Sequence, residues 1–281
     1  MSCAVHAFGD DRAAAARLAA ALSLPLQPIS LHTLPDGETL PRIRAGATTA
    51  LLYRTLDRPD GKLMPLLLAA DALRRAGTRR IVLVAPYMPY LRQDAVFRPG
   101  QPLSRDVIGA VLGAAFDRVV TVEPHLHRTA DLTPVFAGTP VTALSAADLI
   151  AGRLSLASGP VVAGPDAESE PWVRHIAEAI GMPHLVGVKV RQGDREVAVS
   201  FPSAALTQGR RVVIVDDICS TGATLAAATH ALRAAGAASV EIVVVHDLAR
   251  EGLAATLRRA GAASFVASDS CGRRANAIPL A

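Results

Sequence analysis

The stretch VVIVDDICSTGATL, from Val212 to Leu225, decides the fold. An uninterrupted apolar run is typical of a β-strand that is covered on both faces, as in a parallel sheet. Two aspartates, Asp216 and Asp217, follow the run, and small or hydroxylated residues then lead into a helical pattern. Ligands of open α/β sheets bind outside the carboxyl ends of the strands, so this stretch predicts a binding site at such an edge.

Elsewhere in the chain, short β-rich runs alternate with helical stretches that are rich in alanine and leucine. This alternation predicts an α/β fold with parallel sheets flanked by helices. The runs expected to form strands are Thr49 to Tyr53, Arg80 to Pro86, Arg118 to Glu123, Pro160 to Gly164, Arg211 to Val215 and Val240 to His246.

One sequence pattern occurs twice in the chain. The segment DALRRAGTRRIVLVAPY, from Asp71 to Tyr87, resembles HALRAAGAASVEIVVVHD, from His230 to Asp247. Each has a helix, a glycine where a helix C-cap belongs, and a buried strand. Two related domains would explain the repeat, and convergence of two alanine-rich units is the alternative. The turn-rich AGTPVT stretch places the boundary so that the domains are residues 1–145 and 146–281.

Length and composition exclude several classes of protein. The 281 residues, 51% of them hydrophobic, can bury a large core and suggest about two domains. Three widely spaced cysteines indicate neither a disulfide framework nor a zinc cluster, which favours a reducing, cytoplasmic location. No stretch has the pattern of a secretion signal or of a membrane-spanning helix.

The charge pattern bears on possible partners. The net charge is +4, but the arginines are scattered and aromatic residues make up only 4% of the chain. No basic cluster is interleaved with stacking residues, so we expect no nucleic-acid partner. A small anionic substrate fits the modest positive charge, because arginine binds phosphates in a bidentate way.

The residue types in Val212 to Leu225 further restrict the chemical class of the ligand. A carboxylate pair can accept hydrogen bonds from two vicinal hydroxyls, while backbone N–H groups at a helix N-terminus bind a phosphate. A phosphorylated ribose carries both features. The alternative is an acidic strand end with a Ser/Thr helix cap, but a cap needs only one such residue.

VVIVDDICSTGATL resembles the phosphoribosyl-pyrophosphate (PRPP) binding motif of type I phosphoribosyltransferases and PRPP synthetases. Over nearly its whole length the chain resembles the PRPP synthetase (ribose-phosphate pyrophosphokinase) family. The resemblance implies two similar phosphoribosyltransferase-type domains, the first with ATP-binding loops and the second with the ribose 5-phosphate site and a catalytic flap. It implies a ribose-5-phosphate site made of Asp216, Asp217, Ser220, Thr221, Gly222, Ala223 and Thr224.

The implied activity is transfer of the pyrophosphoryl group of ATP to ribose 5-phosphate, which yields PRPP and AMP. A phosphoribosyltransferase, which consumes PRPP, is one alternative, and a catalytically silent synthetase-like regulatory partner is another. No G-x-x-x-x-G-K-[ST] motif is present, which argues against a P-loop kinase.

Two segments of the first domain resemble the family's ATP-binding loops. LPDGETLPRI, from Leu34 to Ile43, is similar to a loop that holds adenine across a subunit interface, which implies that role for Leu34, Asp36 and Glu38. The alternative is a turn followed by an edge strand. In APYMPYLRQDAVFRPGQPLS, the resemblance assigns ATP contacts to Arg92 and Gln93, and a solvated loop is the alternative.

The resemblance also implies magnesium (Mg²⁺) as the cofactor. His125, in VEPHLHRT, matches a histidine that holds the metal at the nucleotide; His127 stays unassigned, and no third soft ligand supports zinc. Asp166 matches a second magnesium-associated residue near the ribose, although it can also cap the next helix. After Asp166 this chain reads Ala-Glu-Ser-Glu-Pro-Trp, where the family pattern is glycine-rich and then basic.

GVKVRQGDREVAVSF, from Gly187 to Phe201, predicts a β-hairpin. Residues two apart on a strand face the same side, so Lys189 and Arg191 can point at one site. In the family this Lys-x-Arg pair is catalytic, and two exposed surface cations are the alternative. The family resemblance further implies a homo-oligomer, commonly a dimer that forms hexamers; phosphate activation, ADP inhibition and nucleotide preference stay open.

Overall fold

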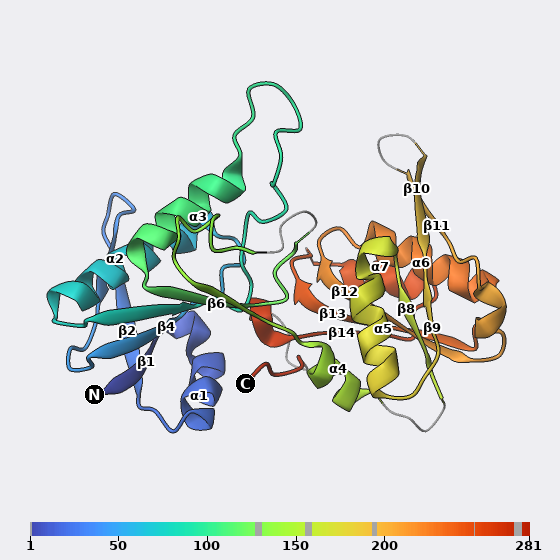
Figure 1. Cartoon of the computed structure of the whole chain (residues 1–281), viewed down its shortest axis with the longest axis horizontal. Coiled ribbons are helices and arrows are strands. Elements are labelled where there is room, and N and C mark those ends of the chain that lie inside the picture. Colours follow the sequence, from blue (N-terminus) through green and yellow to red (C-terminus); the bar gives the residue numbers. More distant parts are fainter. Residues whose placement is uncertain (1, 127–130, 155–158, 193–195, 250, 273–276) are drawn as a thin grey trace. The chain divides into compact units, whose positions relative to one another are not determined.

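The computed structural model describes residues 2–126, 131–154, 159–192, 196–249, 251–272 and 277–281, and of residues 190–192 and 196–197 it describes the backbone only. Two compact units make up the chain, and Figure 1 labels their elements. The first unit extends to Leu144 and includes Ser270–Gly272 and Ala281. The second extends from Ser145 to Asp269 and includes the C-terminal residues up to Leu280.

The first unit is built on a seven-stranded sheet with the order β3-β2-β1-β4-β5-β6-β7. All neighbouring strands are parallel except β2 and β3, which are antiparallel. The strands are β1 (Cys3–Phe8), β2 (Leu26–Thr33), β3 (Thr39–Arg42), β4 (Thr49–Tyr53), β5 (Arg80–Val84), β6 (Arg118–Val122) and β7 (Val141–Leu144). The helices are η1 (Gly9–Asp11), α1 (Arg12–Ala21), α2 (Asp60–Arg75) and α3 (Ser104–Ala115).

Helices cover both faces of this sheet (Figure 1). Buried alanines of α1 pack with Val5 and Ala7 of β1 on one face. On the other face, buried leucines of α2 and α3 pack with alternate residues of β4 and β5, such as Leu52 and Leu83. Two-sided burial explains why these strands have apolar runs instead of a simple alternation.

The second unit is built on a five-stranded parallel sheet with the order β14-β13-β12-β8-β9. The separate hairpin β10-β11 is antiparallel, as the sequence predicts. The strands are β8 (Val161–Gly164), β9 (His184–Val186), β10 (Val188–Gln192), β11 (Glu196–Ser200), β12 (Arg211–Cys219), β13 (Ser239–Asp247) and β14 (Ser264–Ala267). The helices are α4 (Ala147–Arg153), η2 (Ala167–Ser169), α5 (Glu170–Ala179), η3 (Ala204–Thr207), α6 (Ala223–Ala234) and α7 (Leu253–Arg259). The short helix η4 (Asp269–Cys271) begins with the last residue of the segment Ser145–Asp269, and its other two residues belong to the first unit.

The two sheets share a topology around their central strands. In the first unit, β1 leads through α1 to β2 on one side, while β4 leads through α2 to β5 on the other. In the second unit, β8 leads through α5 to β9, while β12 leads through α6 to β13. The strand order therefore reverses between β1 and β4 and between β8 and β12, which is where open α/β sheets bind ligands.

One strand is longer than its sequence pattern predicts. The apolar run predicts an end at Val215, but β12 continues through both aspartates to Cys219. The reason is its neighbour β13, which pairs with it as far as Cys219 opposite Asp247 and satisfies its backbone groups.

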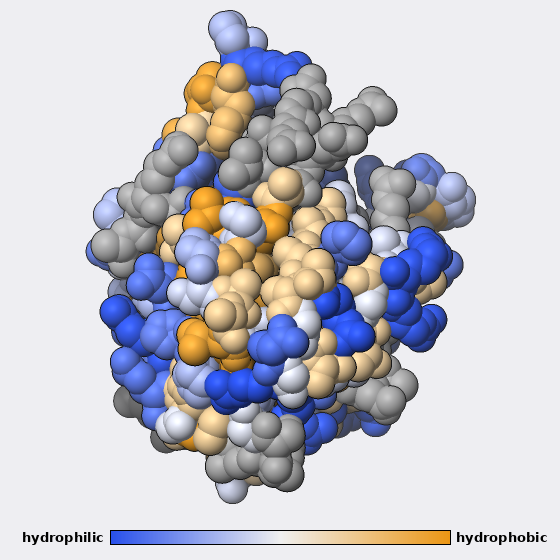
Figure 2. Space-filling view, turned by 90° about the vertical axis from the view of Figure 1, so that its right-hand side faces the viewer, coloured by the Kyte–Doolittle hydropathy of each residue, from blue (hydrophilic) through white to orange (hydrophobic). Residues whose placement is uncertain are grey.

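No helix within the described residues has the length and apolar character needed to span a bilayer. On the face of the molecule that Figure 2 shows, apolar residues gather in the middle and hydrophilic residues lie around them.

Candidate active site

The candidate site lies in the second unit, where β12 extends beyond its neighbour β8. The pairing of β8 with β12 ends at Ala163 opposite Ile214, so β12 continues without β8 alongside it. Asp216 and Asp217 lie on this extension, and Asp166 follows the end of β8 by two residues. Parallel strands place their carboxyl ends at one edge, so all three carboxylates belong to the same edge of the sheet.

The charges at this edge act on one another. Burial raises the pKa of the Asp216 carboxyl well above its ordinary value, and the negative charges of Asp217 and Asp166 raise it further. A hydrogen bond from the Asp217 backbone N–H, 3.1 Å from Oδ1 of Asp216, and the positive charge of Lys189 lower that pKa in part. The three carboxylates at this edge therefore carry more negative charge than Lys189 offsets. Such an edge suits a ligand with hydroxyl groups, which donate hydrogen bonds, or a metal ion.

The loop after β12 is shaped by one glycine. Gly222 has a φ of +79°, and it precedes the first residue of α6. A Cβ atom at this position would lie 2.2 Å from Cδ1 of the buried Leu253, so both the backbone conformation and the space favour glycine here. The turn directs Ser220 and Thr221 into the N-terminus of a twelve-residue helix, whose first N–H groups have no carbonyl partner within the helix.

The base of the β10-β11 hairpin packs tightly against the Asp166 segment. The Gly187 N–H donates to the Gly164 carbonyl at 2.8 Å, and a Cβ atom on Gly187 would lie 2.5 Å from the Pro165 carbonyl oxygen. Two residues further on, Nζ of Lys189 lies 3.8 Å from Oδ2 of Asp166. A glycine is thus required where the hairpin leaves the sheet, because this close approach brings Lys189 to the acidic edge.

The other member of the Lys-x-Arg pair, Arg191, lies on β10 opposite Val197 of β11. Its backbone position is two residues from Lys189 on the same strand, as predicted, and its side chain lies outside the described part of the structure. The turn of the hairpin, residues 193–195, also lies outside that part.

Asp166 also caps a helix, as its alternative interpretation predicts. Its Oδ1 accepts a hydrogen bond from the Glu168 N–H at 3.2 Å, at the start of η2. Glu168 and Glu170, which follow in the segment that departs from the family pattern, are exposed. Capping uses one carboxylate oxygen, and it is the other, Oδ2, that lies close to Lys189.

In the first unit, LPDGETLPRI forms a turn followed by an edge strand, which is the alternative that the sequence left open for this segment. The Leu34 N–H donates to the Glu38 carbonyl at 2.8 Å, and Oδ1 of Asp36 accepts from the Glu38 N–H at 3.1 Å. The following strand β3 is the edge of the sheet. Asp36 and Glu38 are exposed and Leu34 is half-buried, so the tip of this hairpin is open to a ligand.

Arg92 and Gln93 lie side by side, both exposed, in the loop between β5 and α3. The Gln93 N–H donates to the Tyr90 carbonyl at 3.0 Å, and Oε1 of Gln93 accepts from the Ser104 hydroxyl at 2.6 Å. These bonds fix the turn and leave the Arg92 guanidinium in solvent.

His125 is half-buried in the segment after β6, close in sequence to Glu123. Glu123 has a φ of +36°, an uncommon backbone conformation for a non-glycine residue, and its N–H donates to the Leu144 carbonyl of β7 at 2.9 Å. His127 lies outside the described residues.

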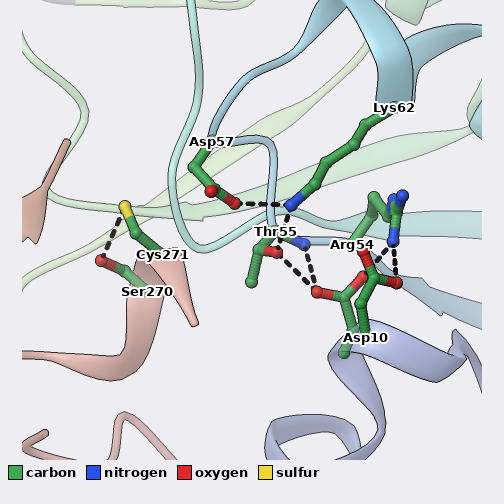
Figure 3. Close-up of polar contacts among 8 residues, drawn as sticks. Asp10, Arg54, Thr55, Asp57, Lys62, Ser270 and Cys271 are labelled. Atoms are coloured by element: carbon green, nitrogen blue, oxygen red, sulfur yellow. Dashed lines mark hydrogen bonds and ion pairs between the residues drawn. The ribbon is translucent and has the colours of Figure 1, made fainter. Parts of the chain in front are cut away.

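A buried ion-pair network at the strand reversal of the first unit was not expected from sequence (Figure 3). Nη1 of Arg54 donates to Asp10 at 2.5 Å and to Asp11 at 2.7 Å. Asp11 also accepts from the Thr55 hydroxyl and N–H, and the Lys62 ammonium donates to Thr55 at 3.0 Å and to Asp57 at 2.5 Å. The contacts join the ends of β1 and β4 to the first turn of α2.

One feature of the amino-acid composition, the scarcity of lysine, distinguishes a residue of this network. The chain has two lysines among its 29 Lys and Arg residues, and they are Lys62 and Lys189. Arginine and lysine are not interchangeable, because a lysine presents a compact ammonium and an arginine a planar guanidinium. Both lysines contact acidic residues near the strand reversals of the two sheets.

Comparisons with known proteins identify the family of the chain. The family described as "N-terminal domain of ribose phosphate pyrophosphokinase" matches residues 4–115, and "Phosphoribosyl transferase domain" matches residues 141–259. The ribose-phosphate pyrophosphokinase of Pyrococcus furiosus is 31% identical over 84% of both chains. That of Aeropyrum pernix is 33% identical over 87% of this chain and 80% of its own.

Among solved structures, the phosphoribosylpyrophosphate synthetase of Mycobacterium smegmatis matches 96% of this chain and 89% of its own. The TM-score is 0.81, and the sequence identity is 25%. Together with the relatives that cover most of their own length, these matches show that the chain belongs to the ribose-phosphate pyrophosphokinase family.

Proposed function

We propose that this protein transfers the pyrophosphoryl group of ATP to the anomeric hydroxyl of ribose 5-phosphate and so forms PRPP and AMP. The observation that carries the proposal is the meeting of Asp166, Asp216, Asp217 and Lys189 at one sheet edge. This edge lies beside the N-terminus of α6, so groups for a sugar and groups for a phosphate occupy one place.

The ribose 5-phosphate site uses two parts of the opening stretch. Asp216 and Asp217 accept hydrogen bonds from the ribose hydroxyls, which offsets the burial of the negative charge of Asp216. The backbone N–H groups of the loop and first helical turn bind the 5-phosphate, and the positive end of the helix dipole favours its charge. The residues of this phosphate site are Ser220, Thr221, Gly222, Ala223 and Thr224.

In the transfer step, the anomeric oxygen attacks the β-phosphorus of ATP. A new bond forms between this oxygen and the β-phosphorus, and the bond from the β-phosphorus to the bridging oxygen of the α-phosphate breaks. The hydroxyl proton is lost to solvent, and AMP leaves with the bond electrons. Lys189 and Arg191 stabilise the negative charge that builds up on the transferred group, and the step needs no covalent enzyme intermediate.

The acidic edge also fits Mg²⁺, which prefers oxygen ligands and keeps several waters. Asp166 would hold the ion near the ribose and His125 would hold one at the nucleotide, and a bound Mg²⁺ supplies neutralisation of phosphate charge. Within the described residues, no three His, Cys, Asp or Glu side chains are grouped to hold a metal by themselves. Such a sparse protein contribution is usual for Mg²⁺, because substrate phosphates complete its coordination.

The nucleotide is held by the first unit. Arg92 binds phosphate and Gln93 binds the base or its phosphates, while Leu34, Asp36 and Glu38 at the tip of the β2-β3 hairpin contact the adenine of an ATP bound to a second copy of the chain. This arrangement requires a homo-oligomer, a dimer or a hexamer. Exposed apolar side chains on the same unit, Leu31, Leu40, Met64 and Leu68, support self-association.

The reaction is tested by incubating the purified protein with Mg·ATP and ribose 5-phosphate and quantifying AMP and PRPP together. A variant with Lys189→Ala and Arg191→Ala is compared with a control variant, Arg258→Ala with Arg259→Ala, which removes the same charge from the exposed end of α7. Equal amounts of AMP and PRPP, lost only in the first variant, are expected. AMP formation without PRPP, or no AMP from a protein that binds ribose 5-phosphate, would overturn the proposal.

A further inference from the structure

Tyr90 connects two elements of the first unit. Its hydroxyl donates a hydrogen bond to Oδ1 of Asp60, which is the first residue of α2. The backbone of Tyr90 has a φ of +64°, a left-handed conformation that costs a non-glycine residue of order 1 kcal/mol or more. Since such a conformation persists only where its surroundings hold it, the bond to Asp60 is one of the contacts that fix this turn.

The fixed turn leads directly to the proposed nucleotide residues. The Tyr90 carbonyl accepts the N–H of Gln93, and the Gln93 side chain accepts the hydroxyl of Ser104, the first residue of α3. The Arg105 N–H also approaches the Gln93 carbonyl at 3.4 Å. The short segment with Arg92 and Gln93 is thus tied at one end to α2 and at the other end to α3.

The start of α2, to which Tyr90 is tied, is itself held in place. Lys62, in the first turn of α2, donates to Thr55 and Asp57 at the end of β4, as Figure 3 shows. Asp57 is 5% exposed and Thr55 3%, so this attachment is buried and resists competition from water. The helix that carries Asp60, the acceptor for the Tyr90 hydroxyl, is therefore attached through buried groups to the end of β4.

We propose that Tyr90 and Asp60 form a positioning pair, which holds Arg92 and Gln93 in the geometry that binds the ATP phosphates. The inference rests on the proposed function, because it needs Arg92 and Gln93 to contact ATP. Neither Tyr90 nor Asp60 contacts substrate in this proposal; both act through the loop. By accepting its hydrogen bond, Asp60 also raises the pKa of the Tyr90 hydroxyl, which further favours the protonated, donating form.

The test uses Tyr90→Phe, which removes the hydroxyl and keeps the ring. Loss of one bond to an exposed carboxylate predicts a rise in KM for ATP of about three- to tenfold, with KM for ribose 5-phosphate and the thermal midpoint unchanged. Asp60→Ala is expected to give the same rise, and the double variant is expected to be no worse than either single one. Asp60→Asn, which retains an acceptor, is expected to recover part of the loss.

Asp71→Ala is the matched control, because it removes an exposed carboxylate from the same helix and an ion pair with Arg75. Its KM for ATP should equal that of the unaltered protein. Direct titration with a non-hydrolysable ATP analogue gives a second readout that does not depend on turnover.

The outcomes separate the two proposals. If the unaltered protein forms PRPP and AMP but Tyr90→Phe has a normal KM and affinity for the nucleotide, the positioning pair is overturned and the activity stands. If the two substitutions are additive, the residues act independently and the pair is again overturned. If the unaltered protein forms neither product, the proposed function itself fails.

Discussion

Nζ of Lys189 lies 3.8 Å from Oδ2 of Asp166, with side chains that are 29% and 21% exposed. The pair joins the hairpin β10-β11 to the end of β8. It also adds a positive charge that lowers the pKa of Asp216 against the effects of burial and of Asp217. Lys189 therefore acts as a counter-ion for the acidic edge. In the proposed reaction the same ammonium contacts the transferred pyrophosphoryl group.

Lys189→Ala should reduce kcat by about 10²- to 10³-fold, because the variant loses a positive charge that stabilises the transition state. Lys189→Arg should recover only part of this loss, since a planar guanidinium does not replace a compact ammonium. The measurement is steady-state production of AMP with saturating ATP and ribose 5-phosphate. An alanine variant with normal kcat would show that the hairpin contributes no catalytic charge.

Asp216→Asn should stabilise the folded protein without ligand and raise the KM for ribose 5-phosphate. The raised pKa of Asp216 shows that its charged form is unfavourable in the folded state, so the neutral amide should increase the free energy of unfolding by roughly 0.5–2 kcal/mol. The KM for ribose 5-phosphate should rise by about tenfold, because an amide is a weaker acceptor for a hydroxyl. Denaturant unfolding and initial rates measure the two effects.

Asp148→Asn is the control for this substitution, since Asp148 lies in the same unit and its side chain is 86% exposed. It should change neither stability nor KM appreciably. A drop in stability for Asp216→Asn would contradict the account of charge at the sheet edge.

Gly187→Ala should move the base of the hairpin. Its Cβ would lie 2.5 Å from the Pro165 carbonyl oxygen and 2.8 Å from Cγ1 of Val199, so either the hairpin or the Asp166 segment must shift. We expect a loss of about 1–3 kcal/mol in stability together with a lower kcat, because Lys189 leaves its position. Gly152→Ala, in α4 with no atom within 4 Å of the added Cβ, should be neutral or stabilising. Equal behaviour of the two variants would refute the close-approach argument.

Some of the features behind these predictions follow from local sequence patterns, and others depend on contacts between distant segments. The run before Asp216 predicted a buried strand and the hairpin pattern predicted β10 and β11, because both depend on local periodicity. The true end of β12 depends on its pairing with β13, which no local pattern encodes. The lack of space at Gly187 likewise comes from Pro165, which is more than twenty residues away in the chain. In the sequence alone, Gly187 therefore resembles an ordinary loop glycine.

The buried network of the first unit shows the same limit. Arg54 and Asp11 are 43 positions apart, and only the parallel pairing of β1 with β4 brings them together. The scarcity of lysine distinguishes Lys62 from the other cations of the first unit, but it does not identify the partners of Lys62. Tyr90 lies within a loop that sequence recognised as functional, while its bond to Asp60 depends on how α2 packs.

Asp11→Ala should destabilise the first unit strongly. Arg54 is 4% exposed, its guanidinium lies 4.4 Å from the Phe8 ring, and the substitution removes its buried carboxylate partner. Leaving a charge buried with only the half-exposed Asp10 as a partner should lower the free energy of unfolding by roughly 3–5 kcal/mol. Asp71→Ala, which breaks an exposed pair, should change it by less than about 1 kcal/mol in the same chemical denaturation series. Similar losses for both would mean that burial of the Arg54 pair is energetically unimportant.

His6 should make stability depend on pH. It is 1% exposed on β1, neither ring nitrogen has a hydrogen-bond partner within the described structure, and burial lowers its pKa below the usual 6.5. Below pH 6.5 the unfolded chain therefore binds a proton that the folded chain resists, so the free energy of unfolding falls as the pH drops from about 7 to 5.

His6→Leu should remove this part of the pH dependence. It should also stabilise the protein at pH 7 by roughly 1–3 kcal/mol, since two unpaired polar atoms leave the core. Urea unfolding at several pH values measures both effects, with His230→Leu, at an exposed position of α6, as the control that should keep the slope of the unaltered protein. If His6→Leu kept the full slope between pH 7 and 5, the proton uptake would belong to other groups and the buried imidazole would not be its source.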